Sequence, residues 1–232
     1  MRISLQKNSL DLSVVIPTIN EGPNLYQLLP RLKEALEEIR ARYEILIIDG
    51  DSKDGTESIV NSAGATYIHE ERPGYGNAIL RGLSEAKGTY VLTMDADLSH
   101  PAAFVKNLWD AREDADITIA SRYVHGGHAE QPLFRLFLSK ALNTFLRKGL
   151  SVDVKDLSSG YRLYKKNIFG RLDLEFTNFV LLTEILIKAH GHGFTIQEVP
   201  FHYKPRGSGS SKARIFRFGL DYLRMLYRVW KI

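Results

Sequence analysis

The sequence predicts an α/β protein with a doubly wound, mostly parallel sheet that is covered by helices on both faces. Two observations in the first half of the chain support this fold class. Short apolar runs with β-strand character recur there, and segments with helical spacing separate them. Strands that alternate with helices in this way form βαβ units, which place helices on both faces of one sheet.

The elements follow one another in a regular order. The first predicted strand, residues 13–16, ends at Pro17, and the helix after it, residues 25–39, carries leucines on one face. Further strands are predicted at residues 43–48, 65–69, 89–94 and 116–120, and further helices at residues 56–62, 77–86 and 102–111. Ligands of such sheets bind beyond the carboxyl ends of the strands, so we expect a site in the loops that start at Pro17, Asp49, His69 and Asp95.

After Arg122 the alternation of strands and helices weakens. Helices are predicted at residues 133–150, 179–189 and 215–231, and a strand at residues 194–203. Residues 205–211, with the sequence PRGSGSS, predict a mobile loop because Gly and Ser favour irregular backbone.

The composition excludes several kinds of site. The 232 residues include no cysteine, so disulfides and thiolate metal sites are excluded. Oxygen ligands would favour Mg²⁺ or Mn²⁺. The first residues lack the apolar core of a signal peptide, and no run reaches the roughly 18 uncharged apolar residues of a spanning helix. We therefore expect a cytoplasmic protein.

The charge is unevenly distributed along the chain. Residues 205–232 carry seven Lys or Arg residues and one Asp, a net charge of +6, which leaves −2 for the remainder of a chain of net charge +4. This basic end predicts an anionic partner. Aromatic and leucine residues interleaved with the cations favour a membrane surface over nucleic acid.

The strongest local motif is Asp95-Ala96-Asp97, directly after the strand predicted at residues 89–94. Two carboxylates at a strand end can turn towards one pocket, where a hard cation would complete its shell with phosphate oxygens and water. The alternative is a solvated acidic turn before the helix that follows Pro101. The motif alone leaves both interpretations open.

Two other strand-end loops carry carboxylates. Asp49 follows the strand at residues 43–48 and is placed to accept hydrogen bonds from a base or ribose, whereas Asp54-Gly55-Thr56 is typical of a turn and helix start. Glu21 lies in the loop after the first strand, where it could contact a ligand or stabilise a helix N-terminus.

Taken in order, the motifs resemble those of a known family. The stretches VVIPTINE, IIDGDSKDGT, GYGNA, TMDADLSHP, SRY, SSGYR and RGSGSSK resemble family-2 glycosyltransferases of GT-A fold, and more narrowly the dolichyl- or polyprenyl-phosphate mannose (or glucose) synthases. The resemblance spans about residues 11–213. It implies a GT-A-like catalytic domain over residues 1–213 and a basic amphipathic helix at the membrane interface over residues 214–232. Within the domain, residues 11–122 would bind the nucleotide sugar, and residues 123–213, with a mobile loop at 205–212, would face the acceptor.

The resemblance also implies roles for individual residues. The nucleoside pocket would be lined by Pro17, Glu21 and Asp49. Asp95 and Asp97 would face the ribose, the diphosphate and the metal, and Ser99 stands where relatives often have a Gln that helps the metal site. The phosphates of the donor or acceptor would be contacted by Arg122, Arg162, Arg206 and Lys212. The candidate catalytic residues are then Asp97, Arg122, Arg206 and Lys212, and the metal would be Mg²⁺ or Mn²⁺.

Two positions depart from the family pattern. Ile19 stands where relatives usually have Tyr, and Gly50-Asp51 reverses the usual Asp-Gly order. Both departures lie next to the predicted nucleoside pocket. They leave both guanine and uracil as candidate bases, and the sequence leaves both mannose and glucose as candidate sugars.

The chemistry of the acceptor leaves two mechanisms. Displacement of a nucleoside diphosphate builds negative charge that a divalent ion and arginines can stabilise. A phosphate acceptor is already ionised and requires only a cationic pocket, whereas a hydroxyl acceptor requires a base, for which Asp156 and Glu184 are candidates. The loop at residues 205–212, which carries Arg206 and Lys212, has two interpretations. It would be a lid that orders on donor binding, or a flexible linker to the last helix.

We therefore expect inverting transfer of a hexose, with mannose favoured, from a GDP-mannose or UDP-glucose type donor to a polyprenyl phosphate. The protein would associate peripherally with the cytoplasmic face of a membrane, with a small membrane subunit as a further candidate partner and no nucleic acid. The alternatives are transfer to a saccharide or other hydroxyl, a non-catalytic nucleotide-sugar-binding subunit, and a nucleotidyltransferase. The last usually has a Gly-rich basic loop after the first strand, which this chain lacks.

Overall fold

The computed structural model of this protein describes residues 10–130, 143–144 and 152–204. The strands in this part are β1 (Leu12–Thr18), β2 (Tyr43–Asp49), β3 (Thr66–His69), β4 (Tyr90–Thr93), β5 (Ile117–Ser121), β6 (His128–Ala129), β7 (Arg162–Lys165), β8 (Ile196–Pro200) and β9 (His202–Tyr203). The α-helices are α1 (Gly22–Glu38), α2 (Thr56–Ser62), α3 (Tyr75–Glu85), α4 (Val105–Asp110) and α6 (Val180–Gly191), and the 3-10 helices are η1 (Ala102–Phe104) and η2 (Lys166–Arg171). Up to β5, strands and helices alternate as the sequence predicts.

Seven strands form one sheet in the order β3-β2-β1-β4-β7-β5-β8. The pairs β1–β2, β1–β4, β2–β3 and β5–β8 are parallel, which confirms the mostly parallel sheet. β7 is antiparallel to both β4 and β5, and the sequence analysis did not predict this strand. It is four residues long and begins with the charged Arg162, so it lacks the apolar run that marks the other central strands.

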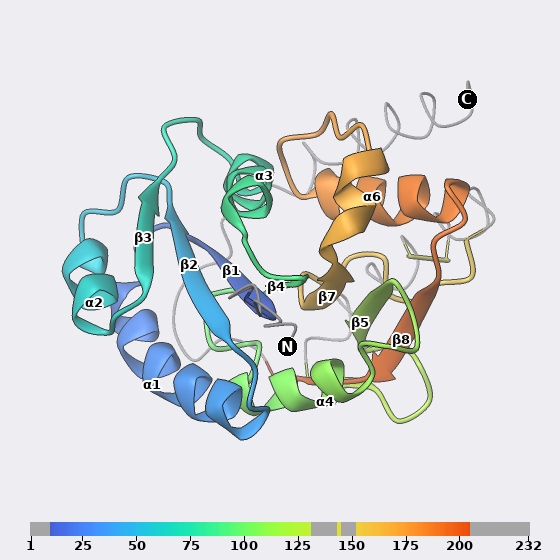
Figure 1. Cartoon of the computed structure of the whole chain (residues 1–232), viewed down its shortest axis with the longest axis horizontal. Helices are drawn as coiled ribbons and strands as arrows, with labels where there is room; N and C mark the ends of the chain where they lie inside the picture. Colours follow the sequence, from blue (N-terminus) through green and yellow to red (C-terminus); the bar gives the residue numbers. More distant parts are fainter. Residues whose placement is uncertain (1–9, 131–142, 145–151, 205–232) are drawn as a thin grey trace, which may run out of the picture.

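The two faces of the sheet are covered by different helices, and β1 shows why. Val14 and Ile16 pack in the core with leucines of α1 and α4, whereas Val15 packs on the opposite side with α3 and α6. Successive side chains of a strand point to opposite faces, so an entirely apolar strand requires cover on both. Figure 1 shows α1 and α4 below the sheet and α3 and α6 above it.

The predicted strand at residues 194–203 is divided in two. β8 ends at Pro200, and β9 pairs with β6 in a separate two-stranded sheet. Phe201, between them, donates its N–H to Ser121 at 2.8 Å and accepts the N–H of His128 at 2.9 Å. The chain therefore crosses from one sheet to the other at this buried phenylalanine.

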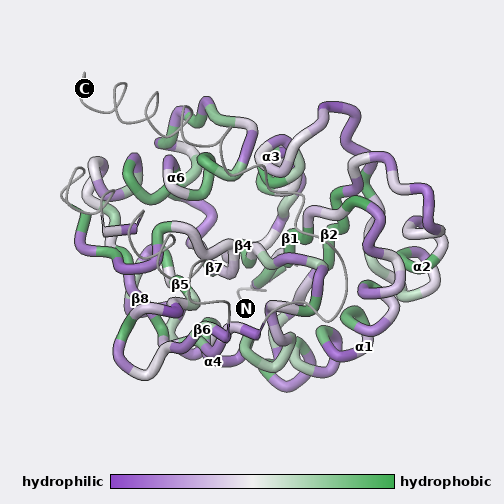
Figure 2. Tube along the Cα trace, turned by 180° about the vertical axis from the view of Figure 1, so that it is seen from behind, coloured by the Kyte–Doolittle hydropathy of each residue, from purple (hydrophilic) through white to green (hydrophobic). Residues whose placement is uncertain are grey.

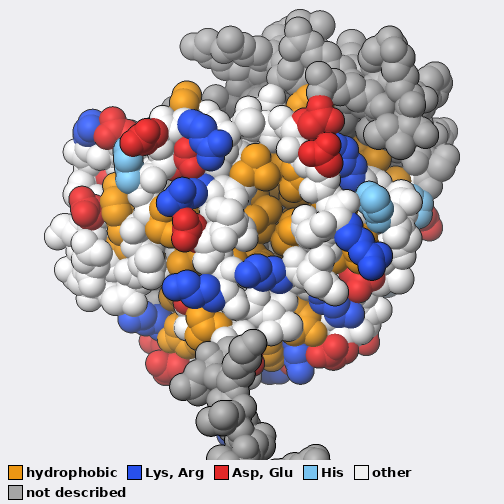
Figure 3. Space-filling view, turned by 45° about the horizontal axis from the view of Figure 1, so that its top comes forward, with side chains coloured by type: hydrophobic (Ala, Val, Ile, Leu, Met, Phe, Trp, Pro, Cys, Tyr) orange, Lys and Arg blue, Asp and Glu red, His pale blue; other side chains and the backbone are white. Residues whose placement is uncertain are grey.

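The surface combines apolar and charged side chains. Figure 2 shows α1 alternating between hydrophobic and hydrophilic residues along its length, as expected for a helix with one buried face. On the face in Figure 3, basic and acidic side chains lie around a central area of hydrophobic side chains.

No helix in the described ranges has the length and hydropathy to cross a membrane. Most of the helix predicted at residues 133–150, and all of the loop and helix predicted at residues 205–231, lie outside those ranges.

Candidate functional site

The loops after β1, β2 and β4 meet at one edge of the sheet. Thr18, the last residue of β1, is in register with Asp49, the last residue of β2. The Met94 N–H donates to Val15 O, which keeps the start of the Asp95–Asp97 turn beside β1. The three carboxylate-bearing loops of the sequence analysis therefore lie together, at the edge where parallel α/β sheets bind ligands.

The first two loops are joined by hydrogen bonds. Asn20 N–H donates to Ser52 Oγ at 2.6 Å, and Asn20 Oδ1 accepts the N–H of Lys53 at 2.9 Å. Asp54 Oδ2 accepts the Gly22 N–H at 2.8 Å and so caps the first turn of α1 from another segment. Burial opposes ionisation of Asp54, but hydrogen bonds from Thr56 and Gly22 hold its pKa below the ordinary value. Asp54 therefore has the structural role that its turn motif predicts.

Asp49 accepts hydrogen bonds from its own loop and from β3. Its side chain is 0% exposed, and its carboxylate accepts hydrogen bonds from the Ser52 N–H and hydroxyl and from the Tyr67 hydroxyl. Burial and the neighbouring carboxylate raise the pKa of Tyr67 to about 12, so this phenol is a donor at neutral pH. In this structure the Asp49 carboxylate shapes the loop at residues 50–52, and its contact with a base or ribose stays a prediction of the resemblance.

The first loop contains Ile19 and Glu21, and Pro17 lies just before it near the end of β1. Pro17 is partly exposed within β1, in register with Ile48. Glu21 precedes α1 and accepts a hydrogen bond from Asn24 Nδ2 at 2.5 Å. Ile19 is 44% exposed, an unusual degree for a large apolar side chain. A nucleoside approaching this edge would therefore meet an aliphatic surface at Ile19.

Asp95 is held from two sides. Its backbone N–H donates to His100 Nδ1 at 2.9 Å, and its Oδ1 accepts the Tyr75 hydroxyl at 3.2 Å. Leu98, in the turn between Asp95 and His100, has a φ of +65°, a backbone conformation that residues other than glycine rarely adopt. The turn is therefore folded sharply enough for His100 to reach back to the start of the motif.

His100 and Tyr75 both contact Asp95 and were not among the candidate residues predicted from the sequence. The His100 ring stacks on Tyr161 with centroids 4.7 Å apart, and the Tyr161 hydroxyl donates to Pro101 O at 3.0 Å. Burial lowers the pKa of His100, which favours a neutral ring whose Nδ1 accepts the Asp95 N–H. Both residues belong to motifs that carried the resemblance, TMDADLSHP and GYGNA, and that membership was the available signal.

The Asp95–Asp97 turn can supply two carboxylate ligands to a hard cation. Asp97 is buried, and its Oδ1 accepts the Ser99 N–H at 3.0 Å, which fixes the side chain within the turn. No cluster of three or more His, Asp or Glu ligands occurs in the part of the chain that the structure describes. Two carboxylates fit Mg²⁺ or Mn²⁺, which complete their shells with substrate phosphates and water. Ser99 is itself buried, and its observed contribution is this backbone bond.

Arg122 is paired with Asp156. Nε and Nη2 donate to the two carboxylate oxygens at 2.7 Å each, and Nη2 also donates to Ser158 Oγ at 2.8 Å. Burial opposes ionisation of Asp156, but the charge and hydrogen bonds of Arg122 outweigh burial and lower its pKa. The guanidinium also lies 5.1 Å from the ring of Tyr123 and 5.6 Å from that of Tyr203. Arg122 is thereby held rigidly, with Nη1 as the nitrogen that could donate to a phosphate.

The two carboxylates considered as bases are both bonded within the protein. Asp156 is 0% exposed and accepts the Arg122 side chain and backbone N–H. Glu184 is also buried, accepts the N–H groups of Glu175 and Phe176 at 3.0 Å, and pairs with Lys188 at 2.8 Å. In this structure both carboxylates are therefore bound by groups of the protein itself.

Arg162, for which the resemblance implied a phosphate contact, has a buried side chain in this structure. Its side chain is 0% exposed, and the guanidinium donates to the carbonyl oxygens of Leu157 and Leu182. Its Nε has no hydrogen-bond partner among the described residues. Because β7 lies in the middle of the sheet, its first side chain enters the core, where Arg162 ties the loop at Leu157 to α6.

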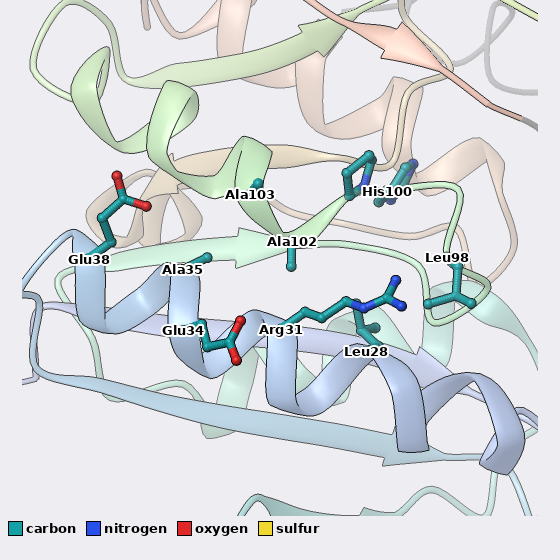
Figure 4. A pocket seen from close by; sticks show the side chains of 10 residues that line it. Leu28, Arg31, Glu34, Ala35, Glu38, Leu98, His100, Ala102 and Ala103 are labelled. Atoms are coloured by element: carbon teal, nitrogen blue, oxygen red, sulfur yellow. The ribbon is translucent and has the colours of Figure 1, made fainter.

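A pocket of about 490 Å³ lies beside the Asp95–Asp97 turn, and its lining includes neither aspartate. It is lined by Leu28, Arg31, Glu34, Ala35 and Glu38 of α1 and by Leu98, His100, Pro101, Ala102 and Ala103. Figure 4 shows Arg31 extending from α1 towards Leu98, and His100 lying across the pocket from α1. The remaining predicted site residues, Arg206 and Lys212, lie outside the described residues.

Comparison with protein families and curated proteins gives consistent matches. The family described as Glycosyl transferase family 2 matches residues 13–173. A dolichol-phosphate mannosyltransferase of Pyrococcus furiosus is 36% identical over 234 residues, covering 96% of this chain and 64% of that protein. A polyprenol monophosphomannose synthase of Mycolicibacterium smegmatis is 34% identical over 214 residues, covering 86% of this chain and 79% of that protein. The chain thus spans less than two thirds of the length of the first relative.

Solved structures match the fold. Glucosyl-3-phosphoglycerate synthase from Mycobacterium tuberculosis, in complex with Mn²⁺ and UDP-glucose, matches with a TM-score of 0.74 at 19% identity, covering 96% of this chain and 80% of that chain. The same enzyme with Mn²⁺, UDP and glucosyl-3-phosphoglycerate matches with a TM-score of 0.69 at 20% identity, covering 95% and 77%. At this level of identity the match shows a common fold, the GT-A-like arrangement that the sequence predicts.

Proposed function

This chain belongs to glycosyl transferase family 2, and from that premise we propose that it moves a hexose, with mannose favoured, from a nucleoside diphosphate sugar to a polyprenyl phosphate, with inversion at the sugar carbon. The observation that carries this proposal is the Asp95–Asp97 turn, which lies beside the loops after β1 and β2 at the ligand-binding edge of the sheet. The names of the two curated relatives support mannose and a polyprenyl phosphate.

The donor would bind along this edge. Pro17, Glu21 and Asp49 would line the nucleoside pocket, with Ile19 beside them. Asp95 and Asp97 would hold the diphosphate through Mg²⁺ or Mn²⁺, with Ser99 fixing Asp97. A divalent ion at this position supplies charge stabilisation for the departing nucleoside diphosphate. The buried turn would contribute rigid placement of the two carboxylates, so that little reorganisation is required as charge develops.

A phosphate acceptor suits the residues around Arg122. An ionised phosphate attacks without a base, and Asp156 and Glu184, the two candidate bases, are bonded within the protein. Arg122 would orient the acceptor phosphate through Nη1, with Asp156 fixing the plane of the guanidinium. From the sequence, Arg206 and Lys212 would add cations to the same pocket.

The partners follow from the acceptor. A polyprenyl phosphate resides in a bilayer, so the enzyme would work at the cytoplasmic face of a membrane as a peripheral protein. The net charge of +6 over residues 205–232 supports attraction to anionic headgroups. A small membrane subunit is a further partner that this arrangement would accommodate.

The test is a transfer assay with Mn²⁺, a panel of nucleotide sugars, and a short-chain polyprenyl phosphate compared with its dephosphorylated alcohol. We expect product from the phosphate alone, and a loss of about 100-fold or more in rate for Asp97→Asn. Asp110→Asn, which alters an exposed carboxylate paired with Lys106 on α4, is the matched control and should transfer at the wild-type rate. Transfer to the alcohol, or an unchanged rate in Asp97→Asn, would reject the proposal.

A further inference from the structure

We propose that Tyr75 is a positioning residue that fixes the Asp95 carboxylate for binding of a divalent cation. The inference rests on the metal-assisted donor site proposed above and assigns one part of it to a residue outside the Asp95–Asp97 motif. Tyr75 is the first residue of α3, and its hydroxyl lies 3.2 Å from Asp95 Oδ1. The phenol therefore donates to the first carboxylate of the motif from an element on the opposite side of the turn from His100.

The ring of Tyr75 is itself held in place. It stacks on Phe179 with centroids 4.2 Å apart and an interplanar angle of 16°. The next residue, Gly76, donates its N–H to Thr177 O at 3.0 Å. A Cβ at residue 76 would lie 2.3 Å from the Thr177 carbonyl carbon. The start of α3 therefore approaches Thr177 so closely that only glycine fits at residue 76. The phenol consequently has little freedom to turn away from Asp95.

The chemical type of the partner matters. A lysine or arginine beside Asp95 would neutralise the carboxylate and compete with a bound cation, whereas a phenol donates one hydrogen bond and leaves the negative charge in place. His100 holds the backbone of the same residue through Nδ1, and its Nε2 lies 3.8 Å from Asp95 Oδ2. Asp95 is thus oriented at both its backbone and its side chain. Such supporting bonds commonly change metal affinity by about 10- to 100-fold.

Gly160 leaves the space that the Tyr75 hydroxyl occupies. A Cβ at this position would lie 2.9 Å from Tyr75 Oη and 3.6 Å from Asp95 Oδ1. The backbone here cannot easily retreat, because the Thr93 hydroxyl donates to Gly160 O at 2.8 Å. A methyl group at residue 160 would therefore displace the phenol from Asp95 without removing it.

The experiment compares two Tyr→Phe variants. Tyr75→Phe keeps the stacked ring and removes only the hydroxyl. Tyr90→Phe makes the same change at a phenol that donates to Glu113 at 2.9 Å, and it is the matched control. Calorimetric titration of Mn²⁺ in the presence of GDP or of UDP gives the metal affinity. We expect about a tenfold weaker Mn²⁺ affinity in Tyr75→Phe and an unchanged affinity in Tyr90→Phe.

A double-mutant cycle adds a second measurement that does not depend on one variant. Gly160→Ala should weaken Mn²⁺ binding about fivefold when Tyr75 is present, and less than about twofold when residue 75 is Phe, because the clashing oxygen is then gone. A purely structural effect of the added methyl would weaken binding equally in both backgrounds, and that result would overturn the inference.

The possible failures are distinguishable. Mn²⁺ affinity in Tyr75→Phe within twofold of a wild type that binds Mn²⁺ would reject the role of Tyr75 and leave the donor site standing. Failure of the wild-type protein to bind Mn²⁺ with either nucleotide would reject the donor site and this inference together.

Discussion

The Arg122 guanidinium donates hydrogen bonds to both carboxylate oxygens of Asp156, each at 2.7 Å, inside the protein. This pair joins the end of β5 to the loop before β7. Because the side chain of Asp156 is entirely buried, removal of its charge would leave the charge of Arg122 without compensation in a region of low polarity.

We therefore expect Asp156→Asn to lower the free energy of unfolding by about 3–5 kcal/mol, measured by urea denaturation. Asp11→Asn is the matched control, since Asp11 also accepts a bidentate Arg side chain, that of Arg42, at the surface. Water and salt screen that pair, so the control should be destabilised far less. Equal losses in the two variants would contradict the buried pair's role.

Glu184 provides a test of the acceptor chemistry. Its carboxylate accepts two backbone N–H groups from residues 175 and 176, so Glu184→Gln should weaken that anchor and cost about 1–3 kcal/mol of unfolding free energy. Under the proposed transfer to a phosphate, which requires no base, the transfer rate per folded molecule should remain near that of the wild type. A rate that falls by orders of magnitude in a folded variant would instead favour transfer to a hydroxyl.

Glu70 makes a contribution to stability that depends on pH. Hydrogen bonds from the Arg72 side chain lower the pKa of Glu70 from 4.5 to about 2. Since the folded-state pKa is the lower one, the contribution is complete above about pH 4.5 and is lost as the pH falls towards about 2. Arg72→Ala should raise the Glu70 pKa towards 4.5, as measured by NMR titration of its carboxyl carbon. Lys106→Ala, which alters another surface ion pair, should leave that titration unchanged.

Gly76 tests how tightly α3 packs against the segment before α6. A methyl group there would lie 2.3 Å from the Thr177 carbonyl carbon and 2.6 Å from Asn178 N, and backbone atoms cannot rotate aside. We expect Gly76→Ala to cost about 3 kcal/mol of unfolding free energy. Gly170→Ala, where an added Cβ meets nothing within 4 Å, is the control and should be close to neutral. Thermal or urea denaturation of both variants decides the comparison.

Much of the fold was predictable because its signals are local. The strands β1, β2 and β5 are apolar runs that are buried on both faces, and α1 carries its leucines at helical spacing, so short windows of sequence were sufficient. β7 was not predictable in this way. Its central place depends on pairing with β4 and β5, from parts of the chain far from it in sequence, and its first residue is an arginine.

The residues of the candidate site also differ in how far local sequence predicts them. The Asp95–Asp97 turn could be found from its motif, since both carboxylates and the strand before them are contiguous. His100 and Tyr75 were not selected, because a hydrogen bond between a ring and a turn leaves no periodic signal. For Arg162 the resemblance implied a phosphate contact, whereas its observed partners are carbonyl oxygens of Leu157 and Leu182.

The sequence by itself determined the class of fold, the family to which the motifs belong and the edge of the sheet where the candidate site lies. Only the tertiary structure decided which polar side chains of those motifs face inward: Asp49 towards Ser52 and Tyr67, and Arg162 towards α6. The physical reason is that a strand or helix is specified by neighbouring residues, whereas the burial of a charge depends on which distant groups are packed against it.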